Sequence, residues 1–235
     1  RYACWQEEFD PHEDRTFEEK FDIVVTPREI VCDPSLALND YSFAQSEIMQ
    51  WANEYVVIKN KHIIAAAREI LKKEKRVSEI IRLCNEYVIA RLVYGNPIKG
   101  LYSSVDALER KTVDCGGFST LLAALSIASG IPARVISGFW AGYGVNNMHA
   151  WLEIMLPGGE WVPLDPSVEY LRRRGRTKKD GGFGFVGSDR IALSLGCGIP
   201  VEAGNKKITI DILQHPVVVS EHGMDSFSVV SEFLT

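Results

Sequence analysis

The chain has 235 residues, of which 46% are hydrophobic and 24% are charged, and its net charge is −5 at pH 7. This is the composition of an ordinary globular protein with one sizeable core. The acidic balance gives no case for nucleic acid or a membrane as a partner, no apolar run approaches the roughly 20 residues that span a bilayer, and no signal peptide is recognisable after Arg1.

The five cysteines predict free thiols. Their number is odd, their spacings are wide and no C-x-x-C pair occurs, so neither a disulfide framework nor a thiolate zinc site is expected. No H-x-x-x-H pair or calcium-loop pattern is present, so we expect no metal. Free thiols favour a reducing compartment such as the cytoplasm. The cysteines are Cys4, Cys32, Cys84, Cys115 and Cys197.

Two regions are expected along the chain. Residues 1–40 read as an N-terminal β segment, because the alternating sequence FEEKFDIVV (17–25) predicts one or two strands that end at Thr26-Pro27. Residues 41–235 are expected to form one compact unit.

The compact unit begins with helical patterns. Apolar residues recur three or four apart in AQSEIMQWANEYVV, HIIAAAREILKKEK and SEIIRLCNEYVIARLVY, which together cover much of 44–94. Ser78 is a candidate N-cap for the third helix, and Gly95-Asn96-Pro97 ends it. Residues 95–112 read as a linker with one short turn at VDALER.

The stretch KTVDCGGFSTLLAALSIASGIPAR (111–134) predicts a further helix with a cysteine at its start. Gly130 and Pro132 end this helix, and either Thr112 or Asp114 is a suitable N-cap. Both choices place Cys115 in the first turn.

From residue 133 onward the pattern changes to strands. The strand candidates are ARVISGFW, MHAWLEIML, EWVPLD, IALSLG, KKITIDIL and PVVVS. Pro163 lacks an N–H, which favours a sheet edge for its strand. A basic stretch (171–179) and a glycine-rich stretch (181–187) are expected to be loops, and we interpret the basic one as a solvated surface. Helices followed by mostly antiparallel strands indicate an α+β fold.

Two interpretations of Cys115 are evenly balanced on this stretch alone. A free cysteine is commonly a small buried apolar residue. In the first turn of a helix, however, unpaired N–H groups and the helix dipole favour the thiolate. Gly116 and Gly117 would let a substrate approach the sulfur closely, and the backbone N–H of Cys115 is a candidate oxyanion donor.

His149 and Asp165 can meet only in one kind of hairpin. A three-residue loop at 156–158 that closes Met155 against Gly159 places His149 opposite Asp165 on one sheet face. A two-residue glycine loop would instead put Asp165 on the other face. The first arrangement supplies a base for the thiol and a carboxylate that orients the base, and we favour it over a purely structural histidine.

The aromatic residues near His149 are weaker candidates for binding substrate. Trp151 and Trp161 share the expected face with His149 and more simply shield the site from water. The loop before His149 either binds an extended peptide or only packs. Its candidate binding residues are Trp140, Tyr143 and Asn147.

These segments resemble the transglutaminase-like superfamily as it occurs in prokaryotic proteins. The resemblance rests on VDCGGFSTLLAALSIASGIPARVISGFW followed by NNMHAWLEIMLPGGEWVPLDPS, and it covers roughly residues 77 to 170. It implies a papain-like core, with the cysteine helix packed on an antiparallel sheet. It also implies that Cys115 is the nucleophile, His149 the general base and acid, and Asp165 the residue that orients the imidazole.

The resemblance implies an enzyme that attacks amides through a thioester. Attack of water would make it a peptidase or amidase, which we favour for prokaryotic members, and attack of an amine would make it a transglutaminase-type acyltransferase. A binding module that retains the fold is the third reading. The family's second oxyanion donor lies upstream of the cysteine, where Tyr94 is a weak candidate. We expect a protein or peptide substrate, no cofactor, and neither nucleic acid nor a membrane as a partner; the oligomeric state stays open.

Overall fold

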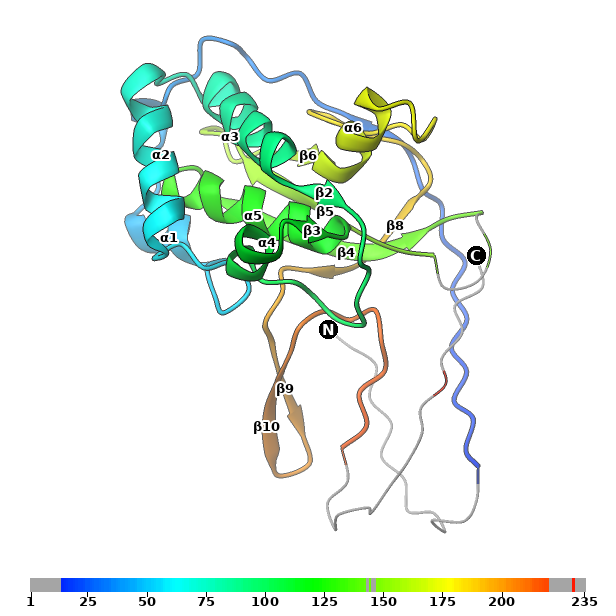
Figure 1. Cartoon of the computed structure of the whole chain (residues 1–235). Coiled ribbons are helices and arrows are strands. Elements are labelled where there is room, and N and C mark those ends of the chain that lie inside the picture. Colours follow the sequence, from blue (N-terminus) through cyan, green and yellow to red (C-terminus); the bar gives the residue numbers. More distant parts are fainter. Residues whose placement is uncertain (1–13, 143, 145–146, 220–229, 231–235) are drawn as a thin grey trace.

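The computed structural model describes residues 14–142, 144, 147–219 and 230. A four-stranded antiparallel sheet lies beside a layer of helices (Figure 1), so the predicted α+β fold is confirmed. The strand order is β6-β5-β4-β8. These strands are β4 (Ala133–Trp140), β5 (Met148–Met155), β6 (Trp161–Leu164) and β8 (Arg190–Leu195). Pro163 thus lies in an edge strand, as its missing N–H predicts.

The helix α5 (Cys115–Ala128) lies at the centre of the molecule. Its residues from Gly116 to Ile127 are all buried, as expected of a helix that is apolar on every side. It contacts β4 and β5 on one side and other helices around it. The surrounding helices are α2 (Lys61–Lys73), α3 (Val77–Arg91), α4 (Ser104–Arg110) and α6 (Pro166–Arg173).

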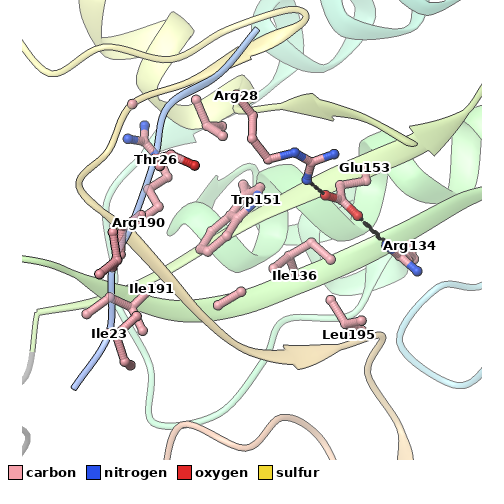
Figure 2. Close-up of a pocket in the computed structure, with 15 residues that line it drawn as sticks. Ile23, Thr26, Arg28, Arg134, Ile136, Trp151, Glu153, Arg190, Ile191 and Leu195 are labelled. Atoms are coloured by element: carbon pink, nitrogen blue, oxygen red, sulfur yellow. Dashed lines mark hydrogen bonds and ion pairs between the residues drawn. The ribbon is translucent and has the colours of Figure 1, made fainter. Parts of the chain in front are cut away.

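The two faces of the sheet have different roles. Alternation along β4 and β5 turns Val135, Leu152 and Ile154 toward α5, where they join the main core. The opposite face carries Trp151 and Glu153, and the extended chain at 23–28 crosses it (Figure 2).

Short elements complete the fold. The strand pairs are β1 (Arg28–Glu29) with β7 (Phe185–Val186), β2 (Val93–Tyr94) with β3 (Thr112–Val113), and β9 (Ile199–Ala203) with β10 (Lys206–Ile210). The remaining helical turns are η1 (Leu38–Asp40) and α1 (Gln45–Met49). Within the described ranges, no helix has the length and apolarity needed to cross a bilayer.

Several predictions about local structure were wrong. Residues 17–25 form no strand, because their alternating side chains have no neighbouring strand to pair with. The first predicted helix shortens to α1, and no strand forms at 216–219. Helix α3 begins one residue before Ser78, since the Val77 N–H bonds the Leu36 carbonyl and ties the helix start to another segment.

The basic stretch was also misread in part. Residues 166–173 form α6, whose N-cap is Asp165 and whose first residue is Pro166. An acidic N-cap followed by proline is a typical helix-start signal, so the sequence DPSVE carried this information. The strand β9 was not predicted. The proposed boundary between an N-terminal segment (1–40) and a compact unit (41–235) stays a prediction.

Candidate active site

His149 and Asp165 form a buried pair. The imidazole Nε2 lies 2.7 Å from the carboxylate Oδ2, and the two side chains are 3% and 0% exposed. His149 is the second residue of β5, and Asp165 directly follows β6. The sheet therefore brings together the two residues that the hairpin argument paired.

The predicted hairpin has the correct parity but the wrong register. Met155 pairs with Trp161 instead of Gly159, and the loop consists of three residues, 157–159. Gly159 takes a φ of +88°, which lets a tight three-residue turn close. In this register Asp165 is not directly opposite His149, as predicted, but is offset from it by two residues along the strand. Its side chain therefore reaches His149 along the diagonal of the same face.

Arg190 is a third member of this network, and the sequence reasoning missed it. Its Nη2 lies 2.8 Å and its Nε 3.2 Å from the same Asp165 Oδ2 that contacts His149. The guanidinium is 1% exposed and also donates to the Asp180 carbonyl at 2.6 Å. The only available signal was a lone arginine at the start of a predicted strand, in a segment far from the hairpin in sequence.

The second oxygen of Asp165 holds the start of α6. Oδ1 accepts hydrogen bonds from the Val168 N–H at 3.0 Å and from the Ser167 hydroxyl at 3.1 Å. Burial alone would raise the pKa of Asp165, but the charges and hydrogen bonds of His149 and Arg190 outweigh it and hold that pKa well below its ordinary value. The Asp165 carboxylate is therefore ionised at neutral pH.

Cys115 begins α5, and Asp114 is the N-cap. Asp114 Oδ1 accepts the N–H groups of Gly116 at 3.0 Å and Gly117 at 3.3 Å. The cysteine is partly exposed. Burial among surrounding groups, followed by the negative charge of Asp114, raises the pKa of the Cys115 thiol to about 12. This direction is opposite to the one that the helix start alone suggests, so the resting thiol is neutral.

The sulfur of Cys115 lies next to the strand that carries His149. The backbone N–H of Ala150 interacts with the thiol and partly offsets the rise in its pKa. Along β5 the N–H groups alternate between neighbours: Met155 donates toward β4, and Leu156 donates toward the β6 side. By this alternation Ala150 points to the β6 side at a level where β6 has already ended at Leu164. The end of β6 thus leaves room for the cysteine.

Two tryptophans contact the imidazole of His149. The ring of Trp140 lies 4.3 Å from that of His149 between centroids, and the ring of Trp151 lies 5.9 Å away and nearly parallel. Trp161 shares the sheet face but lies farther along it, under the guanidinium of Arg134 at 3.9 Å. Trp161 therefore belongs to a neighbouring cluster.

The remaining candidates lie around the site or outside the described residues. Asn147 is half-buried and closes the β4–β5 loop, since its carbonyl accepts the Trp140 N–H at 2.8 Å. Tyr143 lies outside the described residues. Tyr94 pairs with Val113 directly before the Asp114 N-cap. Burial, and then the nearby Cys115, raise the pKa of its phenol. The described residues bring together no cluster of acidic, histidine or cysteine side chains that could hold a metal.

A hollow of about 350 Å³ lies behind the pair, on the outer sheet face. Figure 2 shows Trp151 and Arg190 at its wall and an ion-paired chain of Arg28, Glu153 and Arg134 along one side. Cys115 is not among the lining residues. The hollow therefore borders Trp151 and Arg190, which contact the His149–Asp165 pair, and the thiol does not line it.

Comparison with known proteins finds one family for the central part of the chain. Residues 64–166 match the transglutaminase-like superfamily. This part of the chain is similar to transglutaminase-like domains. The resemblance noted in the sequence is thereby confirmed, and the match contains Cys115, His149 and Asp165. It supports a cysteine-based catalytic role.

Individual relatives are more distant. The chain is 30% identical over 86 residues to the uncharacterized protein YebA of Bacillus subtilis (strain 168), a match that covers 31% of this chain and 12% of YebA. A crystal structure of a candidate cysteine protease from Cytophaga hutchinsonii is similar at 15% identity and a TM-score of 0.45, covering 79% of this chain and 65% of that one. The periplasmic domain of TgpA from Pseudomonas aeruginosa is similar at 19% identity and a TM-score of 0.46, covering 58% and 54%. The chain thus spans a small part of YebA and about two thirds or less of these structures.

Proposed function

We propose that this chain is a cysteine-nucleophile enzyme that acts on amide bonds through Cys115, His149 and Asp165. The observation that carries the proposal is the buried His149–Asp165 pair, with 2.7 Å between Nε2 and Oδ2. His149 lies on the strand β5, and the N–H of the following residue, Ala150, interacts with the Cys115 thiol. A buried carboxylate that holds one ring nitrogen fixes both the orientation and the tautomer of the imidazole.

The proton transfer follows from this tautomer. Because Nε2 is held by Asp165, Nδ1 is the nitrogen left to take the proton from the thiol. The thiolate then attacks the amide carbonyl, and the new oxyanion meets the backbone N–H of Cys115, since Asp114 already accepts the N–H groups of Gly116 and Gly117. The tetrahedral intermediate collapses to a thioester when His149 returns the proton to the leaving amine. Tyr94 is the candidate for a second oxyanion donor.

The raised thiol pKa makes His149 essential to this reaction. A thiol with a pKa of about 12 forms almost no free thiolate at pH 7. Transfer of its proton to His149 creates an imidazolium beside the sulfur, and the opposite charges stabilise each other. The cysteine is therefore activated by its partner and not by the helix start alone.

We propose hydrolysis as the second step, with transfer of the acyl group to an amine as the alternative. Both reactions pass through the same thioester, and only the acceptor differs. Incubation with casein and a fluorescent primary amine separates them, because hydrolysis releases new termini or free carboxyl groups, whereas transfer incorporates the amine into the protein. A binding module would do neither.

Arg190 is proposed to act as a positioning residue. It reaches the reaction through the Asp165 oxygen that it shares with His149. Its charge keeps Asp165 ionised in a site without solvent.

The first test is the pH dependence of iodoacetamide alkylation at Cys115, followed by peptide mapping. We expect the native protein to be alkylated below pH 8 at least about tenfold faster than His149→Ala, since only the native thiol has an acceptor for its proton. Cys84 is the internal control, because it is fully buried and should stay unlabelled in both proteins. Equal alkylation of Cys115 in the two proteins would overturn the proposed pair and favour the binding module.

A further inference from the structure

The basic stretch 171–179 does not lie on a remote surface. It continues α6, whose N-cap is the catalytic candidate Asp165, and it returns to the site because Arg190 and Arg172 bind the carbonyls of Asp180 and Gly181. Six of its nine residues are basic and none is acidic. Figure 1 shows α6 beside β2 and β6, at the end of the sheet that carries the catalytic candidates.

One end of this stretch reaches the cysteine side of the site. The guanidinium of Arg174 lies 3.7 Å over the ring of Tyr170, and that ring lies 5.1 Å from Phe118, one turn after Cys115 in α5. Phe118 also contacts Tyr94 at 6.2 Å between ring centroids. The positive charge of Arg176 lies close enough to Tyr94 to oppose the rise in its pKa.

The other end reaches the histidine side. The ammonium of Lys179 lies 3.7 Å over the ring of Trp140, and the centroid of that ring lies 4.3 Å from the centroid of the His149 imidazole. The stretch therefore spans the site from the neighbourhood of Cys115 to that of His149.

Three of these six cations are not neutralised by ion pairs within the described residues. Arg172 pairs with Asp180, and Arg173 pairs with Glu86. In the described part of the chain, no carboxylate lies within ion-pair distance of the exposed side chains of Arg174, Arg176 and Lys178. Asp114 is the negative group on the cysteine side, and its oxygens accept N–H groups of α5 and of Ile98. A chain with a net charge of −5 thus concentrates unpaired cations at one place, beside its reactive thiol.

We propose that Arg174, Arg176 and Lys178 form a basic rim that binds acidic side chains of a peptide or protein substrate next to the amide attacked by Cys115. The inference rests on the proposed function and names its substrate class. Exposed cations at the edge of the site would raise the local concentration of an acidic segment, most strongly at low ionic strength. A peptide fits better than a nucleic acid, because the chemistry of the site needs an amide carbonyl.

The local potential can be measured at the sulfur without any substrate. The probes are two methanethiosulfonates of similar size, one anionic (sulfonatoethyl) and one cationic (trimethylammonioethyl), and the readout is the ratio of their rates of reaction with Cys115. We expect the combined substitution Arg174→Gln, Arg176→Gln and Lys178→Gln to lower the anion-to-cation ratio roughly three- to tenfold at low salt, and the difference to shrink at high salt.

A matched control removes the same charge elsewhere. Arg68→Gln, Lys73→Gln and Lys75→Gln change three exposed cations at or just after α2, which α3 separates from α6 (Figure 1). This control should leave the ratio unchanged. An unchanged ratio in the rim variant, or equal changes in both, would overturn the proposal. If the triple variant has a lowered unfolding midpoint, the same rate ratio is measured for Arg176→Gln alone.

Peptides separate this inference from the proposed function. Quenched fluorescent peptides that differ only in Glu or Lys beside the reactive amide should be processed at different rates, with the Glu peptide faster and its advantage lost in the rim variant. Equal processing would overturn the acidic preference while supporting the enzyme. If neither peptide is processed, the proposed function fails. The ratio of methanethiosulfonate rates still tests whether the basic rim sets the potential at Cys115. Tighter binding of a single-stranded RNA oligonucleotide than of the Glu peptide, lost in the rim variant, would overturn the assignment to a peptide.

Discussion

Asp165 connects two parts of the molecule through its two oxygens. Oδ1 caps α6, and Oδ2 holds both His149 and Arg190. A carboxylate with no exposed surface survives as an anion only because a guanidinium and an imidazole lie within hydrogen-bond distance. The geometry of the proposed catalytic pair and the start of α6 therefore depend on the same residue.

Arg190→Met should be strongly destabilising, because it leaves the Asp165 anion buried without its permanent countercharge. We expect a loss of about 3–5 kcal/mol in the free energy of unfolding, and a smaller loss for Arg190→Lys, which keeps the charge. Urea unfolding at pH 7 measures both. If Met and Lys variants are equally stable, the charge of Arg190 is not what stabilises Asp165.

The dependence of stability on pH tests the role of Arg190 in a second way. The folded pKa of Asp165 lies below the ordinary value of 3.8, so its contribution is full above that pH and is lost as the pH falls through the lower folded value. The native protein should lose stability steeply below about pH 4, and Arg190→Lys should retain most of that slope. Alkylation of Cys115 across the same variants tests positioning, since a merely structural role would leave its pH profile unchanged.

At the scale of elements, the start of α5 balances two opposing effects. The helix N-terminus favours a thiolate at Cys115, but the Asp114 N-cap supplies a negative charge that disfavours one. Asp114 still accepts two N–H groups that would otherwise be unsatisfied. The cap therefore stabilises the helix and lowers the intrinsic reactivity of its first residue.

Asp114→Asn should separate these effects, because the amide oxygen can still cap the helix while the charge is removed. We expect alkylation of Cys115 at pH 8 to become roughly three- to tenfold faster. Asp114→Ala removes the cap as well and should cost about 1 kcal/mol of stability. Slower alkylation in Asp114→Asn, with an unchanged unfolding midpoint, would show that the charge of Asp114 does not restrain the thiol.

At the scale of the whole molecule, one core buries several thiols. Cys84 of α3 has no exposed surface, and its burial raises its pKa to about 12. An unfolded thiol releases its proton near the ordinary value of 9.0, so the unfolded state is favoured increasingly between pH 9 and pH 12. Stability is full below that range and falls within it.

Cys84→Ala should therefore reduce the dependence of stability on alkaline pH. Each buried thiol contributes a slope of about 1.4 kcal/mol per pH unit in this range. The variant loses some stability at pH 7 through the missing sulfur, but its unfolding free energy should fall less steeply from pH 9 to pH 11. Urea unfolding at three pH values measures the slope, and parallel curves for the two proteins would contradict the prediction.

The sequence determined the local elements and the candidate residues. Helical periodicity placed α2, α3 and α5, alternation placed β4, β5 and β6, and an odd hairpin loop required His149 and Asp165 to share a sheet face. These inferences succeed because they depend on neighbours in the chain, where side-chain direction follows from backbone geometry.

Only the tertiary structure decided the register, the third member of the network and the state of the thiol. The hairpin register depends on turn closure at Gly159, and Arg190 reaches Asp165 only because β8 lies beside β4. The alternation at 17–25 produced no strand, because a strand requires a partner that the sequence does not name. The pKa of Cys115 depends on burial and on Asp165 as well as on its own turn. Each of these features arises from groups far apart in the chain, whose meeting no local pattern records.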